Sequence, residues 1–343
     1  MSIVQKGKLN RLGIFMVPSL CGFFLALSFT GTLHAQASTG DFSRCLADLR
    51  TTALDVGVSA ATFQQATTGL TPDLKTLDRM DRQVELTLTV AEYLARQVTD
   101  DRVRTGRTKL ADHHELLADI EQRYGVDPAI IVAIWGMESS FGAAAGNFSV
   151  IRSLATLSCY GRRQPFFRNE FTSALKILER EEIGADDFLG SWAGAFGQTQ
   201  FIPTSFERLA VDYNNDGRRD IIGHVGDALA SAANYLKQAG WLAGQPWGFS
   251  VRVPPDFTSP VSDWKEPKPL SFWQEQGLTR ADGSPLATEN LSATTRAGLI
   301  VAEKTSDSYF VVLTNFDALH RYNPAVNYAL AIAHLADRIR EYE

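Results

Sequence analysis

Glu138 is the residue whose setting best suits proton-transfer chemistry. It lies near the end of VDPAIIVAIWGMESSFG (126–142), the most apolar helical run that follows the N-terminal leader. Asp127 is suited to the N-cap of a helix, and Pro128 to its first position. The spacing therefore predicts a helix that carries Glu138 in its last turn.

The neighbours of Glu138 on this helix predict a raised pKa. Ile131 and Ile134 precede it by seven and four residues, so all three side chains share one face. An apolar surrounding disfavours the carboxylate anion, and so does the negative end of the helix dipole. A carboxyl group still protonated near neutral pH can act as a general acid. The alternative is that Glu138 lies just past the last buried turn and faces water.

A second segment, GSWAGAFGQTQFIP (190–203), is rich in small residues and neutral hydrogen-bonding groups. Small residues let the backbone approach a ligand closely, while Ser191, Gln198 and Gln200 offer hydroxyl and amide groups. This combination suits a sugar better than a charged substrate. The alternative is a tight contact between two helices through small residues.

A third segment, RYNPAVNY (321–328), places Tyr322, Asn323 and Tyr328 at the start of the last predicted helix. Aromatic rings with amides are typical of sugar-binding clefts. The alternative is that Asn323 caps the helix ahead of a proline and that the tyrosines are half-buried core residues.

The N-terminus has the three-part layout of a secretory signal peptide. Three basic residues precede an uncharged stretch, Leu12 to Leu33, and the small-residue site Ala35-Gln36-Ala37 follows. We therefore expect residues 1–37 to be removed and the remaining chain to be periplasmic. The alternative is an uncleaved membrane anchor, because the uncharged stretch is long enough to span a bilayer.

The composition is that of an ordinary globular protein. Hydrophobic residues make up 45% of the chain and charged residues 21%, with a formal net charge of −6. No basic run is present that could collect phosphates, so we expect no nucleic-acid partner. The length allows one large domain or two modest ones.

Cys45 and Cys159 are the two cysteines that follow the predicted signal peptide. In an oxidising compartment they predict a disulfide that ties the N-terminal helices to the loop after the Glu138 helix. The alternative is a pair of buried free thiols.

The hydrophobic pattern predicts a mainly α protein with a small β-lobe, an α+β fold. Apolar residues recur with helical spacing through the N-terminal region, 38–120, where 80–99 is the clearest helix. Proline-rich, alternating segments at about 246–315 predict a small antiparallel sheet. Further helices are expected around 171–178 and at 225–239 and 324–341.

These segments, with MESSFG (137–142) and CYGRRQPFF (159–167), resemble the B-type lytic murein transglycosylases, relatives of goose-type lysozyme. The resemblance runs from about Phe42 to Ile339. It implies a lysozyme-like transglycosylase core at 121–343, with the β-lobe inserted in it.

The resemblance also implies roles for single residues. Glu138 matches the catalytic acid/base of the family, and Arg162 and Arg163 match an arginine pair near the peptide stem of peptidoglycan. The positions that match glycan contacts are Tyr93, Ser191, Gln200, Tyr322, Asn323 and Tyr328.

The activity implied is cleavage of the bond between N-acetylmuramic acid and N-acetylglucosamine in peptidoglycan strands, without water, to leave 1,6-anhydro ends. One rival is a muramidase on the same fold that admits water. Another is a non-catalytic peptidoglycan-binding protein, against which the intact Glu138 argues. The sequence identifies no cell-wall synthesis or division protein as a partner.

A loop, DYNNDGRRD (212–220), has part of the pattern of a calcium-binding loop. The ligand spacing is offered by Asp212, Asn214 and Asp216. The usual twelfth-position glutamate is replaced by Gly223, although Asp220 or Asp227 could compensate. The alternative is a turn held by its own side chains. We expect no required cofactor and no metal needed for activity.

Overall fold

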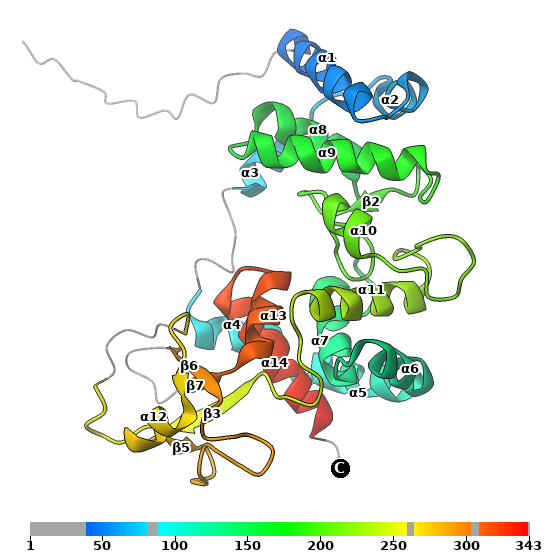
Figure 1. Ribbon diagram of the computed structural model, residues 1–343. Coiled ribbons are helices and arrows are strands. Elements are labelled where there is room, and N and C mark those ends of the chain that lie inside the picture. The colour runs from blue at the N-terminus through cyan, green and yellow to red at the C-terminus, as the bar shows by residue number, and fades with distance from the viewer. Residues whose placement is uncertain (1–38, 81–87, 259–263, 303–308, 342–343) are drawn as a thin grey trace, which may run out of the picture. The chain divides into compact units, whose positions relative to one another are not determined.

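The structure is a computed structural model that describes residues 39–80, 88–258, 264–302 and 309–341 (Figure 1). These residues belong to one compact unit. The predicted signal peptide, residues 1–37, lies outside the described residues, and the division of the rest at residue 120 stays a prediction. No described helix is both long and apolar enough to cross a membrane.

The first helices pack on a helical pair from the middle of the chain. Their bounds are α1 (Thr39–Asp55), α2 (Ala60–Thr67) and α3 (Lys75–Met80), and the pair is α8 (Val150–Tyr160) and α9 (Gln164–Glu179). Apolar side chains from α1, α2, α8 and α9 fill a shared core, which includes Leu49, Leu157 and Phe171. A disulfide joins Cys45 of α1 to Cys159, which is 114 residues further along the chain. The predicted pairing is confirmed, but Cys159 lies in the last turns of α8 and not in a loop.

The helix that carries Glu138 is the centre of a second core. This helix, α7 (Pro128–Ser139), begins as predicted: Asp127 is its N-cap, and the Asp127 carboxylate accepts a hydrogen bond from the Ala129 N–H at 2.8 Å. Ile131 and Ile134 are fully buried. An almost wholly apolar helix is stable only when other elements surround it. Here the surrounding helices are α4 (Val90–Gln97), α5 (Asp100–Asp112), α6 (His114–Tyr124), α11 (Val225–Gln238), α13 (Thr314–Tyr322) and α14 (Val326–Arg340).

The predicted helix at 80–99 is confirmed over its second half. The described helix is α4, and residues 81–87 lie outside the described residues. Thr89 caps α4 through a reciprocal pair of bonds: its hydroxyl accepts from the Glu92 N–H, and the Glu92 carboxylate accepts from the Thr89 N–H. This capping box fixes the helix start at a position that apolar periodicity alone does not mark.

The predicted β-lobe is confirmed as a five-stranded antiparallel sheet in the order β4-β6-β7-β3-β5. Its strands are β3 (Gly248–Arg252), β4 (Lys268–Pro269), β5 (Thr279–Arg280), β6 (Arg296–Val301) and β7 (Tyr309–Val312). One face of the sheet packs over the short helix α12 (Leu270–Glu275) and encloses a third apolar core. Together with the helices, this sheet gives the α+β fold expected from the sequence.

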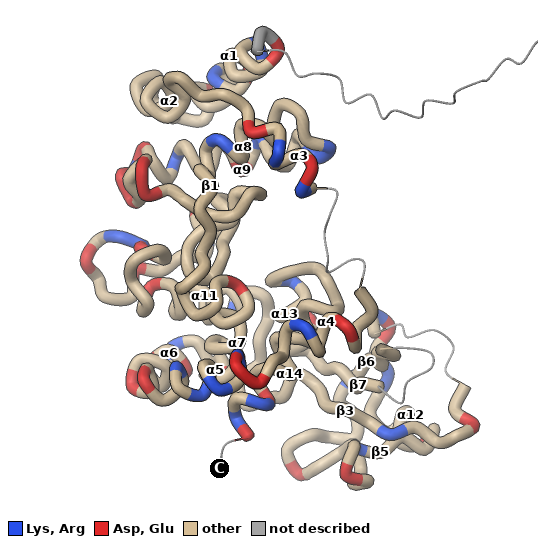
Figure 2. The backbone as a smooth tube through the Cα atoms, turned by 180° about the vertical axis from the view of Figure 1, so that it is seen from behind, with Lys and Arg blue, Asp and Glu red and all other residues tan. Residues whose placement is uncertain are grey.

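A second, two-stranded sheet lies beside the glycine-rich segment. It pairs β1 (Phe148–Ser149), just before α8, with β2 (Leu189–Gly190), and α10 (Pro203–Leu209) ends the segment. Acidic and basic residues are scattered along the described backbone among longer uncharged stretches (Figure 2).

Candidate active site

Glu138 opens into a cavity of about 640 Å³ whose walls come mainly from four separate parts of the chain. Met80 at the end of α3 and Tyr235 of α11 complete the walls, whose four main parts are the end of α7, the start of α9, the segment 192–205 and the turn between α13 and α14. Of the predicted site residues, the cavity is lined by Glu138, Arg162, Arg163, Gln200, Tyr322 and Asn323. The fold thus brings together six residues that the sequence spreads over almost two hundred positions.

Two opposing effects set the protonation of Glu138. Burial raises the pKa of its carboxyl group to about 7, while the Tyr328 hydroxyl donates a hydrogen bond to Oε1 and acts in the lowering direction. Burial outweighs the hydrogen bond, because the charged form loses its hydration while it gains a single donor. The group therefore exchanges its proton near neutral pH, as the apolar face of the helix predicted.

Glu138 is the only acidic residue among the described residues that line this cavity. Glycosidases with two carboxylates place the second one within roughly 5–10 Å, on the other side of the scissile bond. The cavity instead offers a single group able to give and take a proton.

The chain turns sharply after Glu138. Ser140 and Phe141 both have positive φ, 50° and 60°, which is uncommon for residues other than glycine. Ser139 holds this turn, because its hydroxyl donates to the Gln198 carbonyl at 2.6 Å and accepts from the Gly142 N–H at 2.9 Å. Strained backbone of this kind persists only where tertiary contacts enforce it.

Gln198 links helix α7 to the glycine-rich segment and is not among the described residues that line the cavity. The side chain is buried, its Oε1 accepts from Trp135 Nε1 at 3.0 Å, and its Nε2 donates to the Ile222 carbonyl at 3.0 Å. Both ends of the amide are thus engaged within the protein. Its contacts place it in the wall behind Glu138.

Ser191 and Gln200 lie at two ends of the same segment. The Ser191 hydroxyl accepts hydrogen bonds from the Ala193 and Ala195 N–H groups, which shape the loop from within. Gln200 has a φ of 49° and lines the cavity, and its amide nitrogen donates to the carbonyls of Ala145 and Gly197. Its amide nitrogen is thereby fixed in the wall of the cavity.

The tyrosines divide between the cavity surface and the core. Tyr322 lines the cavity and donates to the Thr199 carbonyl at 2.7 Å, and its ring is tilted by 53° against that of Tyr235 with ring centres 4.6 Å apart. Tyr328 and Tyr93 are both buried and lie outside the cavity lining. The contact of Tyr328 with the site is therefore its hydrogen bond to Glu138.

Several lining residues were missed by the sequence analysis, and three of them, Trp192, Phe166 and Arg321, could contribute to binding. Trp192 and Phe166 add aromatic surface to the cavity, and Arg321 adds a cation near Asn323. Phe166 also carries the Arg163 guanidinium over its ring at 4.4 Å. All three lie inside the quoted motifs, so the aromatic argument applied to Tyr322 could have identified Trp192 and Phe166.

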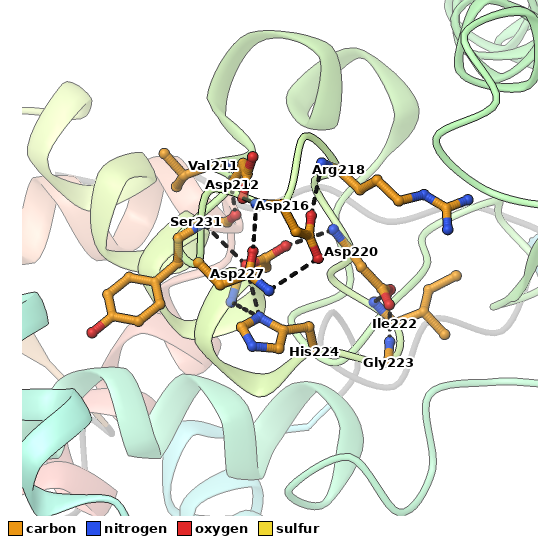
Figure 3. A network of polar contacts seen from close by, with 12 residues as sticks. Val211, Asp212, Asp216, Arg218, Asp220, Ile222, Gly223, His224, Asp227 and Ser231 are labelled. Atoms are coloured by element: carbon orange, nitrogen blue, oxygen red, sulfur yellow. Dashed lines mark hydrogen bonds and ion pairs between the residues drawn. The ribbon is translucent and has the colours of Figure 1, made fainter.

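The loop at 212–220 is held by hydrogen bonds from its backbone N–H groups to its own side chains (Figure 3). Asp212 accepts from the N–H groups of Asp216 and Gly217, while Asp216 accepts from the Arg218 N–H. The Asn214 amide accepts from the Asp216 N–H as well. Among the described residues no group of three or more carboxylate, histidine or cysteine side chains is placed to hold a metal.

The other carboxylate of this region, Asp227, is fully buried and anchors the loop to α11 (Figure 3). It accepts hydrogen bonds from the N–H groups of Tyr213 and Asp220, and His224 Nδ1 lies 2.8 Å from Oδ1. The loop carries Ile221 and Ile222, whose carbonyls accept from Gln198, so it also supports the wall behind Glu138.

Comparison with known proteins identifies the family of the chain. The family described as "Transglycosylase SLT domain" matches residues 41–337. Membrane-bound lytic murein transglycosylase B of Escherichia coli (strain K12) is 32% identical over 250 residues, which are 72% of this chain and 66% of that protein. The matched part is thus just under two thirds of that relative's length.

Solved structures give the same result. SltB3 from Pseudomonas aeruginosa, in complex with NAG-anhNAM-pentapeptide, is 44% identical with a TM-score of 0.83, covering 88% of this chain and 80% of that one. The Escherichia coli lytic transglycosylase Slt35, in complex with calcium, is 28% identical with a TM-score of 0.75, covering 86% and 92%. The chain therefore belongs to the transglycosylase SLT domain family, alongside the lytic murein transglycosylases.

Proposed function

We propose that this protein is a lytic transglycosylase that cleaves the MurNAc–GlcNAc bond of peptidoglycan and leaves 1,6-anhydro-MurNAc ends, with Glu138 as its single acid/base. The observation that carries the proposal is the chemistry of the cavity. One carboxyl group, with its pKa raised by burial to about 7, is the only acid among the described lining residues.

In the proposed reaction Glu138 acts twice. Its proton goes to the glycosidic oxygen as the bond to muramyl C1 breaks, which releases the N-acetylglucosamine side as an alcohol. The resulting carboxylate then takes the proton of the muramyl 6-hydroxyl as that oxygen closes on C1. No water is consumed, and Glu138 ends protonated as it began.

The other site residues bind the substrate or hold the acid. Gln200, Tyr322 and Asn323 offer polar groups and an aromatic ring to the sugars. Arg162 and Arg163 are cations at the same cavity, and carboxylates of a peptide stem are suitable partners for them.

Ser191, Gln198, Tyr93 and Tyr328 act from behind the cavity surface. Tyr328 does so by hydrogen bonding to Glu138, and Gln198 by fixing Trp135 on the catalytic helix. The reaction as proposed uses only side-chain proton transfer and needs no cofactor.

We also propose that residues 1–37 export the protein and that it works in the periplasm, where peptidoglycan lies. The basic, apolar and small-residue parts of the leader support export. The disulfide between Cys45 and Cys159 supports an oxidising compartment.

The nature of the new chain end tests the function. We expect mass spectrometry of digested sacculi to show muropeptides with anhydro-MurNAc ends, which are lighter by one water than reducing ends. Reducing ends in their place would favour a hydrolysing muramidase. Intact sacculi with bound protein would favour a non-catalytic binding role.

A further inference from the structure

A second cavity, of about 330 Å³, lies between the β-lobe and helix α13. The side chains that give it its chemistry are Trp264, Lys265, Arg296, Asp317, His320 and Arg321. Its size falls within the roughly 300–1,000 Å³ of small-ligand sites. No residue of the predicted active site lines it.

The second cavity is rich in positive charge. Lys265, Arg296 and Arg321 contribute three cations, while Asp317 is the only acid among the described lining residues. Burial raises the pKa of Asp317, while the neighbouring Arg321 and His320 charges act in the lowering direction. Burial also lowers the pKa of His320, as does the Lys265 charge, so that His320 is a neutral hydrogen-bonding group near pH 7. An anion is the complementary ligand.

The wall of the cavity is held in place by packing. Trp264 lies against Gly298 of β6 so closely that a Cβ there would be 2.5 Å from the Trp264 Cα. The Trp264 ring also meets His320 at 4.9 Å and Phe316 at 5.3 Å, both in edge-on geometry. Val312 and Leu313 add apolar surface. The cavity thus offers cations at an exposed rim and an apolar wall for an aliphatic stem.

Helix α13 separates this cavity from the one that contains Glu138. Thr314, Asp317 and Arg321 follow one face of the helix toward the second cavity, whereas Tyr322 points to the first. Arg321 lines both. A helix is about 10–12 Å across, and a five-residue extended peptide spans roughly 17 Å, so a peptide attached to a sugar in the first cavity can reach the second.

We propose that this second cavity binds a carboxylate-bearing segment of the peptide carried by the muramyl sugar. The inference rests on the proposed function, and it adds a peptide subsite beyond the arginine pair Arg162 and Arg163. Arg296 and Lys265 bind the carboxylate, and Trp264 packs on the aliphatic part of the peptide.

Kinetics on two substrates test the proposal. One substrate is glycan strands with intact peptides, and the other is the same strands after an amidase has removed the peptides. For R296A combined with K265A we expect KM to rise about three- to tenfold on the peptide-bearing strands and to stay unchanged on the denuded ones. The conservative R296K variant should recover part of the loss.

The matched control is R252A, which removes an exposed arginine from strand β3 of the same sheet that does not line the cavity. It should leave both KM values unchanged. An equal rise of KM on both substrates would show that the cavity serves the glycan or the fold, and unchanged KM on both would show that it binds nothing relevant. Either result overturns the proposal.

A binding measurement separates this inference from the proposed function. Calorimetry of a free acidic pentapeptide with the purified protein needs no cleavage, and the double variant should weaken binding by a similar factor. If the unchanged protein binds the peptide, the double variant does not, and the unchanged protein releases no anhydro product, the subsite is supported and the lytic activity is refuted. Peptide binding unaltered in the double variant would refute the subsite alone.

Discussion

At the scale of single residues, the site depends on how one carboxyl group is surrounded. The sequence predicted the raised pKa of Glu138 from Ile131 and Ile134, and both are fully buried. It did not predict the hydrogen bond from Tyr328, because that residue lies 190 positions away and its motif suggested a sugar contact. Helical periodicity describes neighbours on one helix and not a partner from another.

The Tyr328→Phe variant tests this tuning. The acid step needs protonated Glu138, so activity falls as pH rises through the pKa of about 7. The Tyr328 hydrogen bond stabilises the anion, and its loss should raise the pKa and move the alkaline limb of kcat/KM to higher pH. Tyr322→Phe is the control, because the Tyr322 hydroxyl donates to the Thr199 carbonyl and not to Glu138. A limb displaced to lower pH in Tyr328→Phe would contradict the account.

At the scale of elements, the helices follow from local sequence while their junctions do not. Asp127 and Pro128 predicted the start of α7, and the start of α11 at Val225 agrees with the predicted helix at 225–239. Helix α10 is different, because its N-cap residue, Ile202, makes no side-chain cap. Glu170 from α9 supplies one, accepting from the N–H and hydroxyl of Thr204 at 2.9 and 2.7 Å. A cap lent by a distant helix leaves no local pattern in the sequence.

Removing that cap should loosen the end of the glycine-rich segment. Glu170 is buried, so Glu170→Ala leaves two part-buried donors of Thr204 without this partner. We expect urea unfolding to show a loss of about 1–3 kcal/mol in the free energy of unfolding. Asp186→Ala, at an exposed position, should change it by less than about 0.5 kcal/mol. Equal losses in the free energy of unfolding for the two variants would show that the Glu170 cap does not stabilise the protein.

At the scale of the whole molecule, the fold class, the β-lobe and the disulfide were predicted, and the arrangement of the cavity was not. Composition and periodicity assign helices and strands, whereas the strand order and the meeting of α7, α9 and the turn after α13 depend on long-range packing. Residue types and spacing pointed to Glu138 and to the segments 190–203 and 321–328, and the resemblance added Tyr93, Arg162 and Arg163. Their division into those that line the cavity, such as Gln200, and those that support it, such as Gln198, needed the structure.

The disulfide should matter for the stability of the whole chain. It closes a span of 114 residues between α1 and α8. Chain-entropy estimates for such a span give about 4–5 kcal/mol, so replacing both cysteines with serine should lower the free energy of unfolding by an amount of this order. Urea unfolding of the oxidised protein and of the double variant measures it. Two free thiols per chain in the denatured, unreduced protein would contradict the pairing.

The most direct test of the central claim is the rate of anhydro-muropeptide release by Glu138→Gln. The substitution keeps the shape of the side chain and removes only its transferable proton. Because Glu138 is proposed to act as both acid and base, we predict that the rate falls by at least roughly 10²–10⁴ while the far-ultraviolet circular dichroism stays that of the unchanged protein. A folded Glu138→Gln protein that still releases anhydro-muropeptides at a rate near that of the unchanged protein would show that another group supplies the proton.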